Sequence, residues 1–446
     1  ETTKILENFP EVRNKWLNKI HHILVDEFQD TNDVQFKLIK LLSNQNTEVY
    51  VVGDPDQTIY TWRGANQKII LDFEKTYHGA ETVILDRNYR STKTILDAAN
   101  KLIAHNKKRV PKDLYTNNIY GDPIELFKGA TKDIEAEHVV SMIKKLKNKN
   151  QIDSFRDVAI LYRSSYLTLP LEKALIKERM VYRVFGGVRF YQRKEIKDAL
   201  AYFRLITNPK DDVSFDRIIN VPKRKIGEKS VEQLKKESSA HNLSMYEYVH
   251  DLEKYQTELQ TSVVMALTVL VNKIESVKSQ LTDDGELHSK ILNDFLIDIG
   301  YINYLDLDDN AEERKGNVNA LFQDMTDFIK KNPDEGFSEW LENCTLATSQ
   351  DEMKDDDYVS LMTVHAAKGL EFEKVYIAGC EDGVFPSQMT INSGDSEEIV
   401  PTDTVIFRHF TTKENFYKRI KDEYVVNINR KFFFRYNICI SYFFYL

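Results

Sequence analysis

Two short segments of this chain place carboxylates and amides directly after apolar runs of strand length. In the first, residues 23–25 (ILV) are followed by Asp26 and Glu27; in the second, residues 49–52 (VYVV) are followed by residues 53–57 (GDPDQ). This pattern is typical of buried parallel strands that deliver polar groups to the carboxyl edge of an α/β sheet, where ligands bind. Adjacent carboxylates at that edge can help to hold Mg²⁺ and to activate a water molecule for attack on a phosphate.

The Asp26-Glu27 pair also has a structural interpretation. An acidic pair after a strand commonly serves as a helix N-cap and a first-turn acid, where it interacts favourably with the helix dipole. Taken by itself, the pair leaves both interpretations open. The remaining segments of the chain must decide between them.

Taken together and in this order, the two segments resemble motifs of the UvrD/PcrA/Rep group of superfamily 1 DNA helicases, which move 3′ to 5′ along single strands. Residues 26–30 (DEFQD) resemble the Walker B element of that group, and residues 53–65 (GDPDQTIYTWRGA) resemble its next motif. The resemblance covers roughly residues 10–395. Further matching blocks are residues 88–92 (NYRST), 185–191 (FGGVRFY), 194–198 (KEIKD) and 359–372 (VSLMTVHAAKGLEF).

The resemblance implies a site for ATP and Mg²⁺. In that site Glu27 would be the catalytic base, and Asp26 would be the carboxylate that holds Mg²⁺. Gln57 would sense the γ-phosphate and help to place the attacking water. Tyr89 would stack on the adenine.

Two charged residues complete this implied nucleotide site. Arg90 would reach the γ-phosphate across the cleft between two domains, a task for which the permanent charge and planar fork of arginine are suited. The alternative for Arg90 is a surface ion pair, which is worth under about 1 kcal/mol. Glu371 would hydrogen-bond the sugar of the nucleotide or the groups around its phosphates.

Aromatic residues in the second segment predict contacts with DNA bases. Tyr60 and Trp62 lie two residues apart beside Arg63. In an extended segment this spacing puts both rings on one side, as a stacking platform for bases requires. The alternative is that both rings belong to the core. The resemblance also implies that His365 contacts the backbone of the DNA strand.

A basic turn at residues 221–230 (VPKRKIGEKS) is a second candidate DNA contact. Its Ile-Gly step before a helix resembles a helix-hairpin-helix, which presents backbone N–H groups and a helix N-terminus to a phosphate. Lys223, Arg224 and Gly227 would form the contact. A basic loop capped by glycine is the alternative, and both stay open.

The order of predicted elements indicates an α/β fold. Apolar runs of strand length alternate with helical stretches up to about residue 205, which favours βα units and parallel sheets, whereas residues 206–353 show only helical spacing. Together with the resemblance, this order predicts two RecA-like parallel-sheet domains, the first incomplete, with an all-helical insertion in the second. The main predicted strands are 23–25, 49–52, 83–85, 124–127, 158–162 and 375–378, and the predicted helices include 230–237, 263–280 and 289–299.

We expect the following division of the chain. Residues 1–85 form the C-terminal part of the first RecA-like domain, and residues 86–205 form the first segment of the second. Residues 206–353 form the helical insertion, and residues 354–398 return to the second domain. Residues 399–446 form an aberrant tail.

The composition limits the kind of DNA contact and the compartment. With 61 Lys and Arg against 70 Asp and Glu, the net charge is −9, which argues against binding DNA by bulk electrostatics but allows a groove with local positive charge and stacking rings. Three widely spaced cysteines (Cys344, Cys380 and Cys439) indicate neither a disulfide framework nor a metal cluster. The sequence shows no signal peptide and no apolar run of membrane-spanning length, so we expect a cytoplasmic protein without a membrane partner.

The sequence departs from the family pattern at both ends. It contains no G-x-x-x-x-G-K-[ST] segment, and it reads IVPTD at residues 399–403 where the family continues with a helix carrying a further arginine of the ATP site. The residues that follow are rich in Phe, Tyr, Ile, Asn and Lys, which favours a frameshift near residue 399; a divergent tail is the alternative. We therefore expect an N-terminally incomplete sequence, with little or no ATPase activity from this chain alone.

The function implied by the resemblance is that of an ATP-dependent 3′–5′ DNA helicase of repair, recombination or replication restart. Its partners would be single-stranded DNA, junctions of single- and double-stranded DNA, and repair proteins. Two alternatives stay open. One is the motor part of a helicase–nuclease subunit, and the other is a non-catalytic remnant that only binds DNA.

Overall fold

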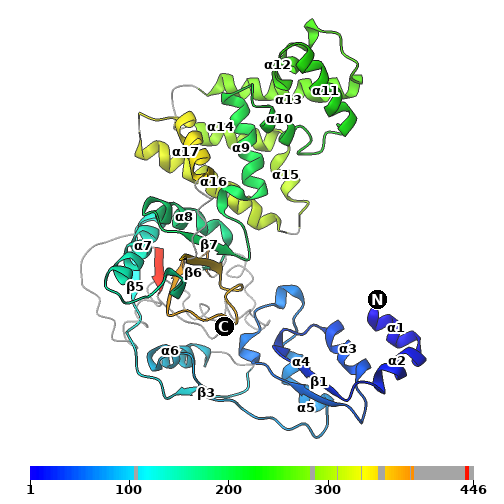
Figure 1. The fold of residues 1–446 in the computed structure, drawn as a ribbon, viewed down its shortest axis with the longest axis vertical. Coiled ribbons are helices and arrows are strands. Elements are labelled where there is room, and N and C mark those ends of the chain that lie inside the picture. Colours follow the sequence, from blue (N-terminus) through cyan, green and yellow to red (C-terminus); the bar gives the residue numbers. More distant parts are fainter. Residues whose placement is uncertain are drawn as a thin grey trace. The chain divides into compact units, whose positions relative to one another are not determined.

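A computed structural model describes residues 1–104, 109–281, 287–308, 310–332, 334–349, 357–381, 383–385 and 437–440. The chain divides into two compact units (Figure 1). Unit 1 comprises Glu1–Arg163 and Met362–Leu446, and unit 2 comprises Ser164–Leu361. The domain boundaries expected from the sequence stay predictions.

A pair of parallel strands positions the two polar segments in unit 1. Strand β1 (His22–Val25) pairs with β2 (Glu48–Val51), and Val25 lies opposite Val51. The strands predicted at 23–25 and 49–52 are thereby confirmed to within one residue. Because the two strands are parallel and in register, the residues that follow them emerge at the same edge of the sheet.

A second sheet of unit 1 contains β5 (Leu126–Gly129), β10 (Asn437–Ile440), β9 (Lys374–Ala378) and β6 (Val158–Tyr162), in that spatial order. Strands β6 and β9 are parallel, whereas β10 is antiparallel to β5 and β9. Every residue of β6 is buried, as expected for a parallel strand covered on both faces. Parallel strands with many helices confirm the α/β class.

One predicted strand is wrong. Residues 83–85 form no strand, because no described residues pair with them, and Val83 and Leu85 are 79% and 76% exposed. The paired segment lies just beyond, where β3 (Arg87–Asn88) runs parallel to β4 (Tyr115–Thr116). An apolar run forms a strand only where a neighbouring chain satisfies its backbone groups.

Two helices of unit 1, α3 (Asp33–Leu42) and α7 (Lys132–Asn148), begin at side-chain caps. In α3 the Asn32 side chain and the Gln35 side chain form a capping box, and in α7 the Thr131 hydroxyl accepts a hydrogen bond from the Ile134 amide. Helix α7 packs on β5, β9 and β10. The other α-helices of unit 1 are α1 (Thr2–Asn8), α2 (Pro10–Leu17), α4 (Lys68–Leu71), α5 (Phe73–Thr76) and α6 (Lys93–Ile103).

Unit 2 is built mainly of helices around one apolar core (Figure 1). Strand β7 (Tyr182–Phe185) lies next to β8 (Val359–Thr363), whose last two residues belong to unit 1. The α-helices are α8 (Thr168–Lys177), α9 (Lys194–Thr207), α10 (Asp212–Ile218), α11 (Glu228–Ala240), α12 (Met245–His250), α13 (Thr261–Gln280), α14 (His288–Asp298), α15 (Tyr301–Leu305), α16 (Ala311–Lys331) and α17 (Phe337–Ser349).

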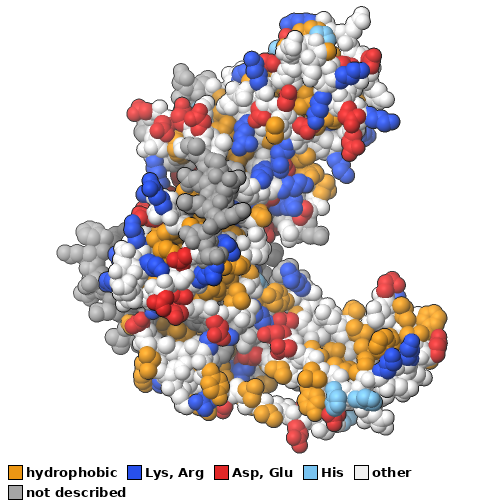
Figure 2. Space-filling model, viewed as in Figure 1, with side chains coloured by type: hydrophobic (Ala, Val, Ile, Leu, Met, Phe, Trp, Pro, Cys, Tyr) orange, Lys and Arg blue, Asp and Glu red, His pale blue; other side chains and the backbone are white. Residues whose placement is uncertain are grey.

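The core of unit 2 follows from helical spacing. Along α13 the residues Val263, Leu267, Leu270, Ile274 and Val277 are buried, which places them on one face of the helix. The helices predicted at 230–237, 263–280 and 289–299 are confirmed as α11, α13 and α14. Acidic and basic side chains are interspersed over these helices on the face drawn in Figure 2. In the described part of the chain, no helix has the length and hydropathy needed to cross a membrane.

Candidate nucleotide site and DNA-contact residues

The candidate catalytic carboxylates lie in the turn that leaves β1. Asp26 and Glu27 are exposed, and the Glu27 amide donates a hydrogen bond of 2.8 Å to Asp26 Oδ1. Glu27 adopts a left-handed backbone conformation with φ of 49°, which non-glycine residues rarely occupy outside turns and functional sites. The Phe28 amide then bonds to the Val52 carbonyl at 2.9 Å and ties this turn to the end of β2.

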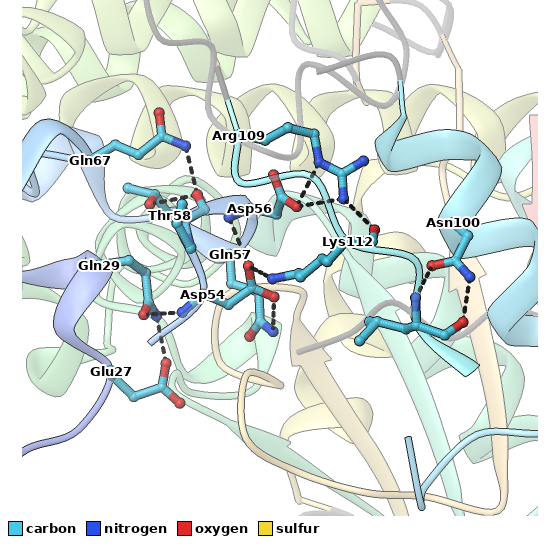
Figure 3. Close-up of polar contacts among 12 residues, drawn as sticks. Glu27, Gln29, Asp54, Asp56, Gln57, Thr58, Gln67, Asn100, Arg109 and Lys112 are labelled. Carbon is cyan, nitrogen blue, oxygen red and sulfur yellow. Dashed lines mark hydrogen bonds and ion pairs between the residues drawn. The ribbon is translucent and has the colours of Figure 1, made fainter. Parts of the chain in front are cut away.

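Gln29 links the two polar segments. Its side chain is buried, with Nε2 donating to Glu27 Oε2 at 2.6 Å and Oε1 accepting from the Asp54 amide at 2.9 Å (Figure 3). Gly53 permits this contact, because a Cβ at that position would lie 2.5 Å from Gln29 Oε1. The candidate base is therefore held by an amide that also fixes the start of the second segment.

The second segment is a compact loop around Asp54. Asp54 Oδ1 accepts from the Asp56 amide at 3.0 Å, and Asp54 Oδ2 accepts from Gln57 Nε2 at 3.1 Å. The Pro55 carbonyl accepts from Thr58 Oγ1 at 3.0 Å and from Gln67 Nε2 at 2.7 Å. These bonds set the orientation of the half-buried Gln57, the candidate γ-phosphate sensor.

Two cations that the sequence analysis missed hold this loop. Lys112 forms an ion pair with Asp54, and Arg109 places Nε and Nη2 3.1 Å from Asp56 Oδ2 (Figure 3). Burial, followed by repulsion from Asp54, raises the pKa of Asp56, and the two cations oppose that rise. Neither cation has a motif signal, because each lies more than fifty residues along the chain from its partner.

Lys368 is a third residue that the analysis missed. It is almost fully buried and lies 3.2 Å from Glu27 Oε2, 2.5 Å from Asp30 Oδ2 and 3.2 Å from the Gln57 carbonyl. Burial raises the pKa of Asp30, an effect that Lys368 opposes. Lys368 belongs to the block 359–372, so a search of that block for cations near the acidic residues could have found it.

The predicted stacking platform needs a correction. Thr61–Arg63 form a turn of 3₁₀-helix, so the extended geometry assumed for Tyr60 and Trp62 is wrong. The Tyr60 ring is half-buried, its hydroxyl donates to the His365 carbonyl at 3.0 Å, and Arg63 lies 5.5 Å from its centroid. The side chain of Trp62 lies outside the described part of the structure. The DNA-contact roles of Tyr60, Trp62, Arg63 and His365 stay predictions.

Arg90 and Glu371 contact one another. Arg90 Nε lies 2.6 Å from Glu371 Oε1, in an exposed pair that joins residues far apart in the sequence. Both are candidate nucleotide ligands, so the structure brings together two residues that the sequence analysis placed in one site. Tyr89 is 73% exposed, and the Arg87 guanidinium lies 4.7 Å from its ring. An exposed ring of this kind is available for stacking.

The basic turn at 221–230 presents only some of its predicted groups. Lys223 and Gly227 are exposed, and Gly227 precedes α11 as its N-cap. The Arg224 guanidinium instead donates to the carbonyls of Ile218, Ile219 and Pro222 and to the Tyr202 hydroxyl. Those bonds brace the turn, and the phosphate contacts of Lys223, Arg224 and Gly227 stay predictions.

The residues of the β1 turn fit Mg²⁺ bound together with a nucleotide. Among the described residues, no group of three or more His, Cys, Asp or Glu could by itself hold a metal ion. Mg²⁺ is commonly held by one or two carboxylates together with substrate phosphates, and it prefers oxygen ligands. The exposed carboxylates of Asp26 and Glu27 supply ligands of that kind.

Comparison with known families identifies the class of the chain. The UvrD/REP helicase N-terminal domain matches residues 1–78, and the UvrD-like helicase C-terminal domain matches residues 83–400. The second match alone covers more than half of the 446 residues. The chain belongs to the UvrD-like helicase family.

Curated relatives agree with this placement. A protein named ATP-dependent DNA helicase PcrA from Staphylococcus epidermidis is 38% identical over 422 residues, and one of the same name from Staphylococcus aureus is 37% identical over 419 residues. In both comparisons the alignment covers 93% of this chain and 56% of the relative. The chain therefore spans about half the length of the curated relatives it matches.

Proposed function

We propose that this chain is part of an ATP-dependent DNA helicase that moves 3′ to 5′ on single-stranded DNA and unwinds duplexes in repair, recombination or replication restart. Family membership supports the helicase activity, and the relatives named ATP-dependent DNA helicase support the use of ATP. A cytoplasmic location and contacts with other repair proteins belong to the same proposal.

One observation carries the proposal: the two polar segments converge on a single set of hydrogen bonds. Glu27, Gln29, Asp54 and Gln57 form a continuous chain of contacts at the ends of two parallel strands. A candidate base and a candidate γ-phosphate sensor are thus oriented by the same buried amide. The left-handed backbone at Glu27 supports a functional role, because strained conformations concentrate at such sites.

The side chains have separate tasks in this proposal. Glu27 orients and deprotonates a water molecule aimed at the γ-phosphate, and Gln57 helps to place that water. Asp26 would help to hold Mg²⁺, which would supply positive charge to the phosphates. Arg90 exchanges its pairing with Glu371 for the nucleotide, which frees the Glu371 carboxylate for the sugar. Tyr89 stacks on the adenine.

The proposed architecture is two RecA-like domains with a helical insertion in the second. Alternating closure of the domains on ATP would move DNA bases past Tyr60 and its neighbours, one step per turnover. Separation of DNA strands requires about 1.4 kcal/mol per base-pair step. This cost is compatible with a small stride driven by the hydrolysis of each ATP.

Strand displacement on tailed duplexes tests the proposal. The protein, as the cell makes it, is incubated with Mg²⁺ and ATP on duplexes carrying a 3′ or a 5′ single-stranded tail. We expect ATP-dependent unwinding of the 3′-tailed substrate and little unwinding of the 5′-tailed or blunt substrate. Equal unwinding of both tailed substrates would reject the polarity, and tight nucleotide-independent binding without unwinding would reject the helicase function.

A further inference from the structure

The loop that carries Gln57 is held from one side by two buried ion pairs. The side chains of Arg109 and Asp56 are 11% and 6% exposed, and those of Lys112 and Asp54 are 13% and 19% exposed. Arg109 also donates to the Lys112 carbonyl at 3.1 Å, so the two cations form one short clamp. We call residues 109–112 the basic clamp.

The basic clamp is anchored to helix α6. The Asn100 side chain donates to the Leu114 carbonyl at 2.7 Å and accepts from the Leu114 amide at 3.3 Å (Figure 3). Two residues beyond the clamp, the chain is therefore attached to a helix that begins directly after the 88–92 block, which contains Arg90. The clamp thus joins the Gln57 loop to the segment that carries two other candidate nucleotide ligands.

Buried ion pairs are a costly way to attach a loop. Removing charges from water opposes folding, and apolar contacts of similar volume are often as stable or more stable. Charged, directional contacts instead fix one geometry of the groups that they join. The basic clamp is therefore better explained by a need for exact orientation of the loop than by its contribution to stability.

Asp54 transmits that orientation in two directions. Its carboxylate contacts Lys112, the Asp56 amide and the Gln57 side chain, while its own amide donates to Gln29. Gln29 in turn holds Glu27. A displacement of Lys112 would consequently change the positions of both Gln57 and Glu27.

We propose that Arg109 and Lys112 are positioning residues of the hydrolytic site, which align the Gln57 loop and Glu27 for attack on the γ-phosphate. Arg109 contacts Asp56 and Lys112 contacts Asp54, and both cations act on Gln57 and Glu27 through these carboxylates. The inference rests on the proposed ATP hydrolysis. It adds that Arg109 and Lys112 align the Gln57 loop and Glu27 for that reaction.

Steady-state ATP hydrolysis by the protein as the cell makes it, measured with saturating single-stranded DNA, tests the proposal. We expect Lys112→Met to lower kcat by about ten-fold or more with little change in KM, because small misplacements of catalytic groups reduce rate more than binding. Lys112→Arg retains the charge and should recover most of kcat. Lys15→Met, at an exposed position of α2, is the matched control and should leave both constants unchanged.

A second variant keeps the test informative if Lys112→Met does not fold correctly. Arg109→Lys keeps the charge but loses the two-nitrogen contact with Asp56, and it should lower kcat with KM and the thermal midpoint nearly unchanged. Wild-type kcat in both Lys112→Met and Arg109→Lys would overturn the inference, as would a loss confined to KM. An inactive wild type would reject the proposed function itself, and the inference with it.

Discussion

Glu27 contacts two side chains of different kinds, and each contact limits what the carboxylate can do. Gln29 supplies a neutral donor that fixes direction, while Lys368 supplies a positive charge shared with Asp30. Glu27 and Asp30 repel each other, and Glu27 adds to the rise in the pKa of Asp30. The positive charge of Lys368 offsets the repulsion between the neighbouring carboxylates of Glu27 and Asp30.

Removal of Lys368 should therefore destabilise unit 1. We expect Lys368→Met to lower the free energy of unfolding by about 2 kcal/mol at neutral pH, because it leaves the partly buried Asp30 without its cation. The loss should shrink at acidic pH, where Asp30 is protonated. Urea denaturation at both pH values measures it. The control Lys374→Met removes a longer ion pair, 3.6 Å, with the exposed Asp122. An equal loss of unfolding free energy in this control would show that the burial of Asp30 does not determine the effect.

Glu135 gives a separate prediction about pH. It is buried on α7, where it accepts a 2.9 Å hydrogen bond from the Gly379 amide, and burial raises its pKa from 4.5 to about 7. The protonated form is favoured in the folded state, so its stabilising contribution is complete below pH 4.5 and is lost as the pH rises through 7.

The variant Glu135→Gln should remove this dependence. Relative to the variant, the wild type should lose up to about 3 kcal/mol of unfolding free energy as the pH rises across that window. Urea titrations at several pH values provide the measurement. Glu137→Gln, at an exposed position of the same helix, should retain the wild-type slope. A wild-type slope in Glu135→Gln would show that the carboxyl ionises freely in the folded protein.

Where the parallel strands β1 and β2 end, the backbone of Gly53 lies close to the residues that follow β1. Gly53 lies where a Cβ would meet Gln29 Oε1 at 2.5 Å and the Phe28 amide nitrogen at 3.0 Å. We expect Gly53→Ala to destabilise the protein by about 1–3 kcal/mol, because backbone and a buried amide must move. Thermal unfolding compares it with Gly187→Ala, where the nearest described atom to the added Cβ is Val184 Cγ1 at 3.8 Å. Equal stability of the two variants would show that a Cβ at position 53 causes no steric clash.

Local patterns predicted most elements of the fold. Strands β1, β2 and β6 and helix α13 follow from short apolar runs or regular spacing, which neighbouring residues determine. Residues 83–85 show the limit, because their apolar composition resembles that of a strand although the described structure provides no pairing partner. The pairing of a strand with its neighbour depends on the tertiary structure, so a short apolar segment cannot predict it by itself.

The same limit explains which site residues were missed. Asp26, Glu27 and Gln57 lie in short motifs and were predicted as candidates, whereas the Lys368–Asp30 contact joins residues 338 positions apart. The 3₁₀ turn at Thr61–Arg63 was missed because residues two apart were assumed to be extended. Contacts distant in sequence depend on how the elements pack, and composition alone contains no signal for them.

Over the whole chain, the net charge is −9. The proposed binding of DNA would therefore depend on a few local cations and aromatic rings. If Arg63 contacts a phosphate, Arg63→Gln should reduce the slope of log affinity against log salt concentration by about 0.7 for single strands. Fluorescence anisotropy at several salt concentrations measures the slope. Lys15→Gln is the control, and an unchanged slope in Arg63→Gln would exclude the phosphate contact.

We propose that the turn after β1 carries out ATP hydrolysis that is coupled to DNA. A decisive experiment compares ATP turnover by the protein as the cell makes it, with and without single-stranded DNA, in the wild type, Glu27→Gln and Glu11→Gln. Glu11 is an exposed glutamate of α2 and serves as the matched control. We predict DNA-stimulated turnover in the wild type and in Glu11→Gln, and a loss of about 100-fold or more in Glu27→Gln. DNA-stimulated turnover that survives in Glu27→Gln would show that Glu27 is not the catalytic base.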